Sequence, residues 1–399
     1  MKRVALLIVF LCSCFSFIAQ QNDSKSKFAV PKQQTRFYPD QPWLDNNGVH
    51  LNAHGGGVLF HKGVYYFYGE HKLAGETVGD IAVHCYSSVD LYNWKDEGAA
   101  LRTATDPNSE ISAGCIIERP KVIYNQKTKK FVMWFHLELK NQLRKSGRSG
   151  VAVSDQPTGP FSYLHSERPD AGRWPINVTA EQKSSLTEAQ KLIGTSFIGS
   201  PHPDRAKLPF MVRDFAGGQM AKDMTLFVDD DGKAYHIFSS EENATLHISE
   251  LSDDYLSHTG KWTRVFEYLW HEAPAICKHN GRYWLLSSNC TGWNPNAARS
   301  AVANSIWGPW TDLGNPCVGT TPKNHLGSQL TFGGQSTFIL PIQGKKGAFV
   351  AMFDTWRPEN LIASGYVWLP IKFTKKRFTI SWHDAWDLSA FSKSKPNTK

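Results

Sequence analysis

Three carboxylates stand at equivalent points of a repeated sequence pattern. Glu118, Asp223 and Glu272 each precede an apolar strand that leads through a tight turn into an aromatic-rich strand. If such strands are arranged around one axis, the residues at their starts converge on a single pocket. Convergent carboxyl groups can supply the general acid and the general base that hydrolysis of a glycosidic bond needs. The sequence therefore predicts an acid–base site assembled from separate strands.

Each carboxylate also has a purely structural interpretation. Glu118 could form a local ion pair with Arg119. Asp223 could brace the start of its strand, and Glu272 could be exposed at an edge. Their shared position favours the functional interpretation, because the coincidence occurs in three repeats. The acidic run 229–231 is followed by a glycine, and we interpret it as a hairpin turn rather than a metal site.

Five β-hairpins of one design supply the strands. Each has an apolar strand, a polar turn and an aromatic-rich strand, and several turns contain a glycine that permits a positive φ. The hairpins occupy residues 57–68, 120–135, 224–238, 275–286 and 337–353. A third strand follows four of them. Short antiparallel strands repeated radially form propeller blades, so the pattern predicts an all-β, single-domain, five-bladed β-propeller.

The propeller is expected to span residues 37–390, with a disordered tail at 391–399. The interval between the second and third hairpins is long and contains a polar stretch rich in Pro and Gly. We assign this stretch, at about 167–222, to an insertion with a short helix at 180–192, because extra loops on one face often build binding specificity. The tripeptide 177–179 is a formal glycosylation sequon that we attribute to chance.

The first residues have the features of an export signal. Residues 1–20 combine a positive start with an apolar run, as in a signal peptide, and 21–36 form a linker. A lipobox ending on Cys14 and an ordinary cut after Ala19 are alternatives. No later apolar stretch reaches the roughly 18 residues of a membrane span. We expect export to the periplasm, to the cell surface as a lipoprotein, or to the medium.

The composition narrows the classes of molecule that the protein is expected to bind. The 14 Trp suit pockets that stack on flat apolar faces such as sugar rings. The net charge of +8 is spread along the chain without blocks, so nucleic acid is not an expected partner. Five cysteines follow the leader, which is too few and too irregular for a disulfide framework or a metal motif. Cys277 and Cys290, on one predicted hairpin, could form a disulfide or remain buried thiols.

The segments around two of the carboxylates resemble glycoside hydrolase family 43. Residues 223–232 are similar to the family segment whose aspartate tunes the pKa of the acid, and residues 272–284 are similar to the segment that carries the general acid. The resemblance extends over all five blades. It implies a five-bladed propeller and an inverting mechanism in which Glu272 is the acid and Asp223 orients it.

The family's aspartate base has no counterpart here. The first blade begins with residues 52–57, Asn-Ala-His-Gly-Gly-Gly, where the family has an Asp-Pro pair. This departure resembles a branch of exo-β-1,3-galactanase-like enzymes, in which a glutamine matching Gln335 handles the water near a glutamate matching Glu118. The segments that carry this resemblance are 52–59, 68–71, 118–124, 291–296 and 334–336.

An amide is a poor base, which leaves two possibilities. Either Gln335 acts through an imidic-acid tautomer, or Glu118 is the base and Gln335 only holds the water. We expect Gln335 at the water with Glu118 assisting. Glu272 needs a pKa raised by burial or by neighbouring charge if it is to stay protonated near neutrality.

The branch resemblance also implies a set of sugar-binding residues. Two tryptophans would stack on a galactose face, although packing between blades is an equal alternative, and polar groups would bind its hydroxyls. The set comprises Glu70, Glu241, Asn243, Thr291, Trp293, Trp356 and Arg357. For His54, beside three glycines, we expect a structural hydrogen bond; the alternative is a central ion, since propellers of this family can hold calcium on the axis.

These inferences predict an exported, inverting, exo-acting β-galactosidase. Its expected substrate is the β-1,3-galactan of arabinogalactan, its expected state is monomeric, and no cofactor is required, with structural calcium possible. Two alternatives remain open. One is an α-L-arabinofuranosidase on the same fold, and the other is a carbohydrate-binding propeller without turnover.

Overall fold

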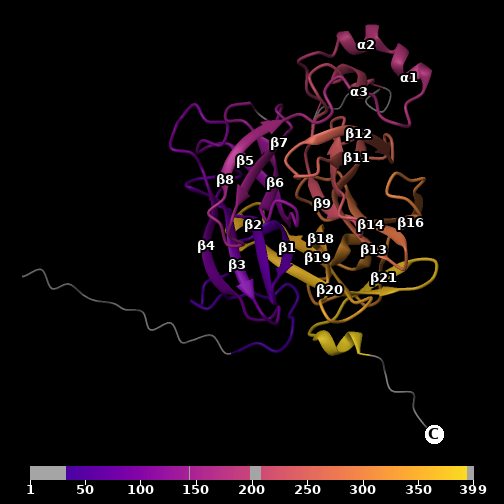
Figure 1. Cartoon of the computed structure of the whole chain (residues 1–399). Coiled ribbons are helices and arrows are strands. Elements are labelled where there is room, and N and C mark those ends of the chain that lie inside the picture. The colour runs from indigo at the N-terminus through magenta and orange to yellow at the C-terminus, as the bar shows by residue number, and fades with distance from the viewer. Residues whose placement is uncertain (1–32, 143, 198–207, 393–399) are drawn as a thin grey trace, which may run out of the picture.

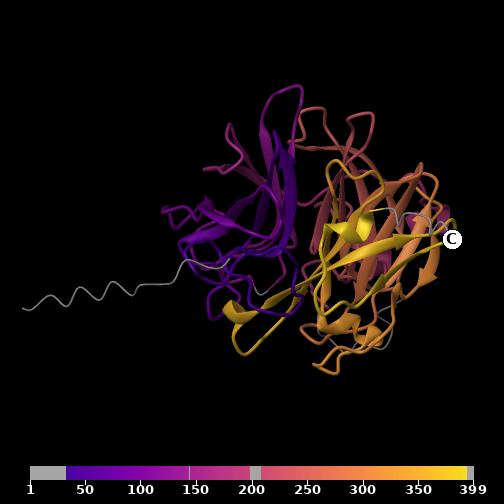
Figure 2. The ribbon, with the colours of Figure 1, turned by 90° about the horizontal axis from the view of Figure 1, so that it is seen from below.

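Five sheets are arranged in a ring in the computed structural model (Figure 1), and their strands are antiparallel except where β17 pairs with β21. The structure describes residues 33–142, 144–197 and 208–392. The first strands of neighbouring sheets, β1, β5, β9, β13 and β18, contact one another in cyclic order. Seen from below, the first blade in indigo lies beside the last in yellow, where the ring closes (Figure 2). The predicted all-β, five-bladed propeller is confirmed.

Each blade is a meander whose strands follow sequence order from the axis outward. The first two blades contain β1 (His54–His61), β2 (Val64–Glu70), β3 (Ile81–Ser88) and β4 (Lys95–Arg102), then β5 (Ile116–Tyr124), β6 (Phe131–Glu138), β7 (Arg148–Ser154) and β8 (Ser162–Glu167). The next two contain β9 (Met224–Val228), β10 (Ala234–Ser240), β11 (Thr245–Leu251) and β12 (His258–Val265), then β13 (His271–His279), β14 (Arg282–Asn289), β15 (Arg299–Ala303) and β16 (Thr311–Gly314). The last contains β18 (Gln335–Pro341), β19 (Phe349–Thr355), β20 (Gly365–Phe373), β21 (Phe378–Ser381) and, at its outer edge, β17 (Cys317–Val318).

The hydrophobic core is divided among the five blade interfaces. One cluster of buried side chains lies between each pair of neighbouring blades. Trp134, Trp284 and Trp368 come from three different blades and are almost fully buried within these clusters. Burying one large apolar side chain stabilises a fold by roughly 1.5–3 kcal/mol, so the aromatic strands of the repeat hold neighbouring blades together.

The two ends of the described chain meet between the first and last blades. Phe37 and Trp386 exchange backbone hydrogen bonds and stack at 4.4 Å between ring centroids. Asp45 pairs with Trp94, directly before β4. The start of β4 lies at the end of the first blade that is far from the start of β1. The last residue of β4, Arg102, lies at the opposite end, beside the start of β3. The segment that leads into the propeller therefore lies on the face opposite the strand starts (Figure 1).

The insertion between β8 and β9 lies at the top of Figure 1, above the third blade. It carries α1 (Ala180–Ser184), α2 (Leu186–Gln190) and α3 (Phe210–Arg213). The single helix expected at 180–192 is thus two short helices, since Ser185 is not helical. Thr179, the last residue of the sequon, caps α1. A buried ion pair between Arg213 and Glu242, at 2.8 Å, attaches the insertion to the third blade.

Several short features complete the description. Among the described residues, 3-10 helices are found at η2 (Ser328–Gly333), η3 (Leu361–Ala363) and η4 (Leu388–Phe391). Phe391, which was expected in a disordered tail, therefore ends η4 and contacts Trp386. The proposed signal segment, Cys14 and residues 393–399 lie outside the described residues. Within the described part, no helix has the length and apolar character needed to cross a bilayer.

Cys277 and Cys290 are thiols, so the disulfide alternative is excluded. Cys277 pairs with Trp284 in the middle of the β13–β14 ladder and is buried in the core. Cys290 follows the end of β14, with its Sγ 3.8 Å from the carbonyl oxygen of Asn243. The two residues therefore lie at different heights of the blade.

Candidate active site

The innermost strands break their ladders at one common level. The register shifts after His54 in β1, after Glu118 in β5, after Glu272 in β13 and after Ser336 in β18. Asp223 directly precedes β9. Bulges re-aim side chains and often occur beside active sites. These irregularities let the residues at the strand starts face the axis, as the repeat pattern predicted.

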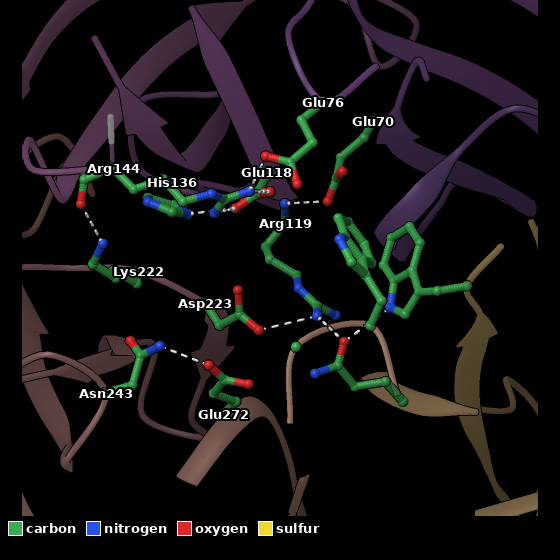
Figure 3. A pocket seen from close by; sticks show the side chains of 14 residues that line it. Glu70, Glu76, Glu118, Arg119, His136, Arg144, Lys222, Asp223, Asn243 and Glu272 are labelled. Carbon is green, nitrogen blue, oxygen red and sulfur yellow. Dashed lines mark hydrogen bonds and ion pairs between the residues drawn. The ribbon is translucent and has the colours of Figure 1, made fainter. Parts of the chain in front are cut away.

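These strand starts surround a pocket of ≈ 220 Å³ (Figure 3). This volume is below the roughly 300 Å³ at which pockets for drug-sized ligands begin, so the pocket suits one small ring. Its walls combine carboxylates with cations, and two tryptophans form one side. The lining residues are Glu70, Glu76, Glu118, Arg119, His136, Arg144, Lys222, Asp223, Asn243, Glu272, Gly292, Trp293, Gln335 and Trp356.

Glu272 has the electrostatics of a general acid. Burial raises its pKa to about 7, and the charge of Asp223 adds to the rise, while Arg119 opposes it. Asn243 Nδ2 donates a hydrogen bond to Glu272 Oε1 at 2.6 Å and so fixes the carboxyl group (Figure 3). A carboxyl group with this pKa is partly protonated near neutrality and can donate a proton there.

Arg119 crosses the floor of the pocket. Its Nη2 lies 3.0 Å from Asp223 Oδ2 and 2.6 Å from Gln335 Oε1, and its Nη1 donates to the carbonyl of Ser336 at 3.0 Å. The guanidinium therefore joins the second, third and fifth blades. It is also the partner of Asp223, so the local ion pair considered for Glu118 and Arg119 does not form.

Glu118 is instead held by Arg144 and His136. Arg144 donates to both of its oxygens at 2.8 and 3.1 Å, and His136 Nδ1 lies 3.0 Å from Oε2. Burial would raise the pKa of Glu118, but these partners outweigh it and hold the pKa well below the usual range. Glu118 is therefore ionised and is a weak base.

The place of the missing aspartate base is occupied by an amide that serves the fold. Asn52 hydrogen-bonds the backbone of Lys72 with both ends of its amide. The Lys72 ammonium lies 2.5 Å from Glu70 Oε2 and 5.6 Å from the centroid of the Trp356 ring. Trp356 and Trp293 meet edge to face at 5.1 Å. Together these contacts support the aromatic wall of the pocket.

Three residues expected to bind sugar do not line the pocket. Glu241 is fully buried, with Arg264 Nε and His247 Nε2 at 2.6 and 2.9 Å from its Oε1, so it offers no surface to a ligand. Thr291 accepts and donates hydrogen bonds within the loop that presents Trp293. Arg357 points to Asp40 at 3.9 Å, outside the pocket.

The described residues offer one group with metal-ligand spacing, Glu118, His136 and Asp223. Arg144 and Arg119 already neutralise its two carboxylates, so a divalent ion would have to displace an arginine. Toward the axis, the ammonium of Lys121 donates to the Gly55 carbonyl at 2.7 Å. Calcium needs six to eight oxygen ligands. The residues described at the pocket and on the axis therefore do not fit a calcium ion.

His54 does not form the structural hydrogen bond that was expected of it. Neither ring nitrogen has a hydrogen-bond partner among the residues that the structure describes, and the buried ring stacks on Tyr366 at 5.1 Å between centroids. Burial holds the pKa of His54 well below its usual value. The contribution of His54 is therefore aromatic packing at the base of the first blade.

Sequence reasoning did not identify the cations of the site. His136 had a usable signal, because it faces Glu118 across the β5–β6 hairpin. Arg144 lies in the loop before β7 and Lys222 in the residues before β9, and both reach the pocket through the arrangement of blades. Contacts between blades join residues that are far apart in the chain, so a single sequence carries no local pattern that would identify them.

A pocket with convergent carboxylates, one of them with a raised pKa, has the groups that hydrolysis of a glycosidic bond needs. A sequence profile described as glycosyl hydrolases family 43 matches residues 168–350. A solved family 43 β-1,3-galactosidase, in complex with galactodeoxynojirimycin, is 50% identical, covers 88% of this chain and 100% of its own, and superposes with a TM-score of 0.80. The chain belongs to glycoside hydrolase family 43.

Other relatives are more distant. The exo-β-1,3-galactanase of Clostridium thermocellum is 32% identical over 88% of this chain and 66% of its own, with a TM-score of 0.71. That of Phanerochaete chrysosporium, solved with β-1,3-galactotriose, is 29% identical over 89% of this chain and 68% of its own, with a TM-score of 0.70. A curated β-D-galactofuranosidase of Aspergillus niger is 30% identical over 131 residues, or 31% of this chain. The chain spans 37% of the length of that relative.

Proposed function

We propose that this glycoside hydrolase is an exo-acting β-galactosidase that removes terminal galactose from β-1,3-galactan with inversion. The observation that carries the proposal is the small pocket in which Glu272, with its raised pKa, lies beside Asp223 while an amide stands in place of the usual base. The relatives named as β-1,3-galactosidase and exo-β-1,3-galactanase support this substrate class. A pocket for one ring suits cleavage at a chain end.

The proposed roles follow from the charges. Glu272 donates its proton to the leaving oxygen, and Asp223 keeps the pKa of Glu272 high. Gln335 and Glu118 handle the attacking water. Because inversion proceeds by one direct attack of water, the water must lie on the opposite side of the sugar from Glu272.

Four lining residues are proposed to hold the galactose. Trp293 and Trp356 form an aromatic wall on which an apolar sugar face can stack. Asn243 and Glu70 line the same pocket and offer polar groups for hydroxyls. We also propose that residues 1–20 direct export, in keeping with a polymeric substrate that does not enter cells. The proposed substrate in nature is arabinogalactan.

The direct test is hydrolysis of β-1,3-galactobiose. Wild-type enzyme is expected to release galactose, and Glu272→Gln is expected to lose at least about 10³-fold in kcat, because the amide cannot donate a proton to the leaving oxygen. Proton NMR of the first product should show α-galactose, the inverted anomer. Release of arabinose alone from arabinogalactan would identify an arabinofuranosidase. Binding of galactan without turnover would identify a carbohydrate-binding propeller.

A further inference from the structure

The side-chain amide of Gln335 is held on both sides. Its Oε1 accepts hydrogen bonds from Arg119 Nη2 at 2.6 Å and from Trp356 Nε1 at 2.9 Å, and its Nε2 donates to Ser288 Oγ at 3.1 Å. Guanidinium and indole nitrogens only donate hydrogen bonds. The atom between Arg119 and Trp356 must therefore be the oxygen, which sets the orientation of the amide.

An amide oxygen has two lone pairs, and here both are occupied. We propose that Arg119 and Trp356 are positioning residues that fix Gln335 as a hydrogen-bond donor, so that it holds the attacking water through its second Nε2–H and does not take the proton of that water. The inference rests on the proposed function and concerns how the same site handles water. Glu272 gives its proton to the leaving oxygen. The attacking water becomes strongly acidic as its oxygen bonds to the anomeric carbon, so its proton can pass to Glu118, which is ionised although it is a weak base.

The imidic-acid alternative conflicts with this geometry. For Nε2 to accept a proton, the tautomer must carry a hydrogen on Oε1. That hydrogen would face Arg119 and Trp356, which offer donors and no acceptor. An O–H group directed at two N–H groups loses two hydrogen bonds and gains none. The surroundings therefore stabilise the amide form of Gln335.

Arg119 cannot readily leave this position. Its guanidinium is also bound to Asp223 and to the carbonyl of Ser336, and its side chain is only 5% exposed. Its backbone has φ 55°, a left-handed conformation that is strained for a residue other than glycine. Such strain persists only where the surroundings determine it. Here the Arg119 N–H donates to Glu70 Oε1 at 2.8 Å, which helps to hold the strained residue.

A glycine makes room for this support. A Cβ at Gly55 would lie 2.0 Å from Glu70 Oε1 and 3.3 Å from Arg119 Cδ. Only glycine permits this close approach. The contacts Gly55 to Glu70, Glu70 to Arg119 and Arg119 to Gln335 thus connect the first, second and fifth blades. The orientation of the amide is determined by the assembled ring.

The first test is Trp356→Phe, which keeps an aromatic wall but removes the indole N–H. If Gln335 acts as a held donor, kcat on β-1,3-galactobiose should fall about tenfold while KM changes less than about twofold. Affinity for galactodeoxynojirimycin, measured by calorimetry, should stay within the same factor. Trp382→Phe is the matched control, since its indole binds Asp384 outside the site, and it should leave all three quantities unchanged. Unchanged or increased kcat in Trp356→Phe would overturn the inference.

The second test is the pH dependence of Gln335→Glu. The comparison is made below about pH 6, where Glu272 is protonated. In that range a carboxyl group can replace the amide donor only when it is protonated, so residual activity should still rise as the pH falls. If position 335 takes the proton of the water, the ionised carboxylate is the better base, and activity should instead rise with pH. Thermal unfolding of both variants checks that they are folded. A wild-type enzyme that cleaves no β-1,3-galactoside refutes the proposed function, whereas an active wild type with the second pH profile refutes this inference alone.

Discussion

The side-chain amide of Asn52 brackets the backbone of Lys72: Oδ1 accepts from the Lys72 N–H at 2.8 Å, and Nδ2 donates to the Lys72 carbonyl at 2.9 Å. This pair of bonds needs one acceptor and one donor, which an aspartate cannot supply. The loop after β2 then places the Lys72 ammonium against Glu70 and the aromatic wall. Asn52, which the resemblance matches to the family's aspartate base, thus helps to build the pocket.

Asn52→Asp should therefore not restore a base. The carboxylate loses the bond to the Lys72 carbonyl and is buried, so we expect a loss of about 1–3 kcal/mol in the free energy of unfolding and no gain in kcat. Urea denaturation and steady-state kinetics measure the two effects. Asn47→Asp, the same change at an exposed residue of the preceding segment, is the control and should alter neither quantity. A rise in kcat of Asn52→Asp would contradict this account.

The pH profile should report Glu272. Because burial and Asp223 raise its pKa to about 7, the protonated form that donates is lost above that pH, and kcat/KM should fall along a basic limb there. Asp223→Asn removes the neighbouring negative charge, so the pKa of Glu272 should fall and the limb should move to lower pH. Asp253→Asn, whose side chain is 90% exposed on a distant turn, should leave the limb in place. If the basic limb of the pH profile does not move in Asp223→Asn, the charge of Asp223 does not raise the pKa of Glu272.

Gly55→Ala should damage both stability and turnover. The residue has φ 59°, and the added Cβ would collide with Glu70 Oε1, which supports Arg119. We expect a loss of at least about 1–3 kcal/mol in the free energy of unfolding, with kcat reduced more than KM is raised. Gly63→Ala is the matched control, because φ is also positive there, 89°, but the space around its Cβ is open. Equal effects of the two substitutions on kcat would show that backbone strain alone is responsible.

Glu241 should act on stability rather than on substrate binding. Arg264 and His247 outweigh burial and lower its pKa to about 2. A carboxylate whose pKa is depressed in the folded state contributes stability above its unfolded pKa of about 4.3, and this contribution is lost as the pH falls toward 2. Glu241→Gln leaves Arg264 without its buried counter-charge and should cost about 3–5 kcal/mol, with KM unchanged.

The control for this substitution is Glu188→Gln, which breaks an exposed pair with Lys191 and should cost at most about 0.5 kcal/mol. Thermal unfolding between pH 2 and pH 7 measures both variants. Removal of Glu241 should flatten the acid side of the stability curve. A Glu241→Gln enzyme with wild-type stability and a raised KM would place this residue in the sugar site after all.

The fold was predictable because its signals are local. Each hairpin carries its own strands and turn, so the blades and the level of Glu118, Asp223 and Glu272 could be read from one sequence. The orientation of the Glu241 side chain could not be predicted from the sequence. Residues 241–243 all have positive φ, so that the chain turns sharply and Asn243 reaches the pocket while Glu241 enters the blade. Such a turn of non-glycine residues is set by surrounding contacts and has no sequence signature.

The segment that leads into the propeller joins it on the face opposite the pocket, where Asp45 pairs with Trp94. A bead or a fusion partner attached close to residue 33 would therefore lie on the face opposite the pocket. The strand starts that line the pocket would face outward, toward a long polysaccharide chain end. Attachment through this end is thus the arrangement in which an immobilised form would keep access to polymer.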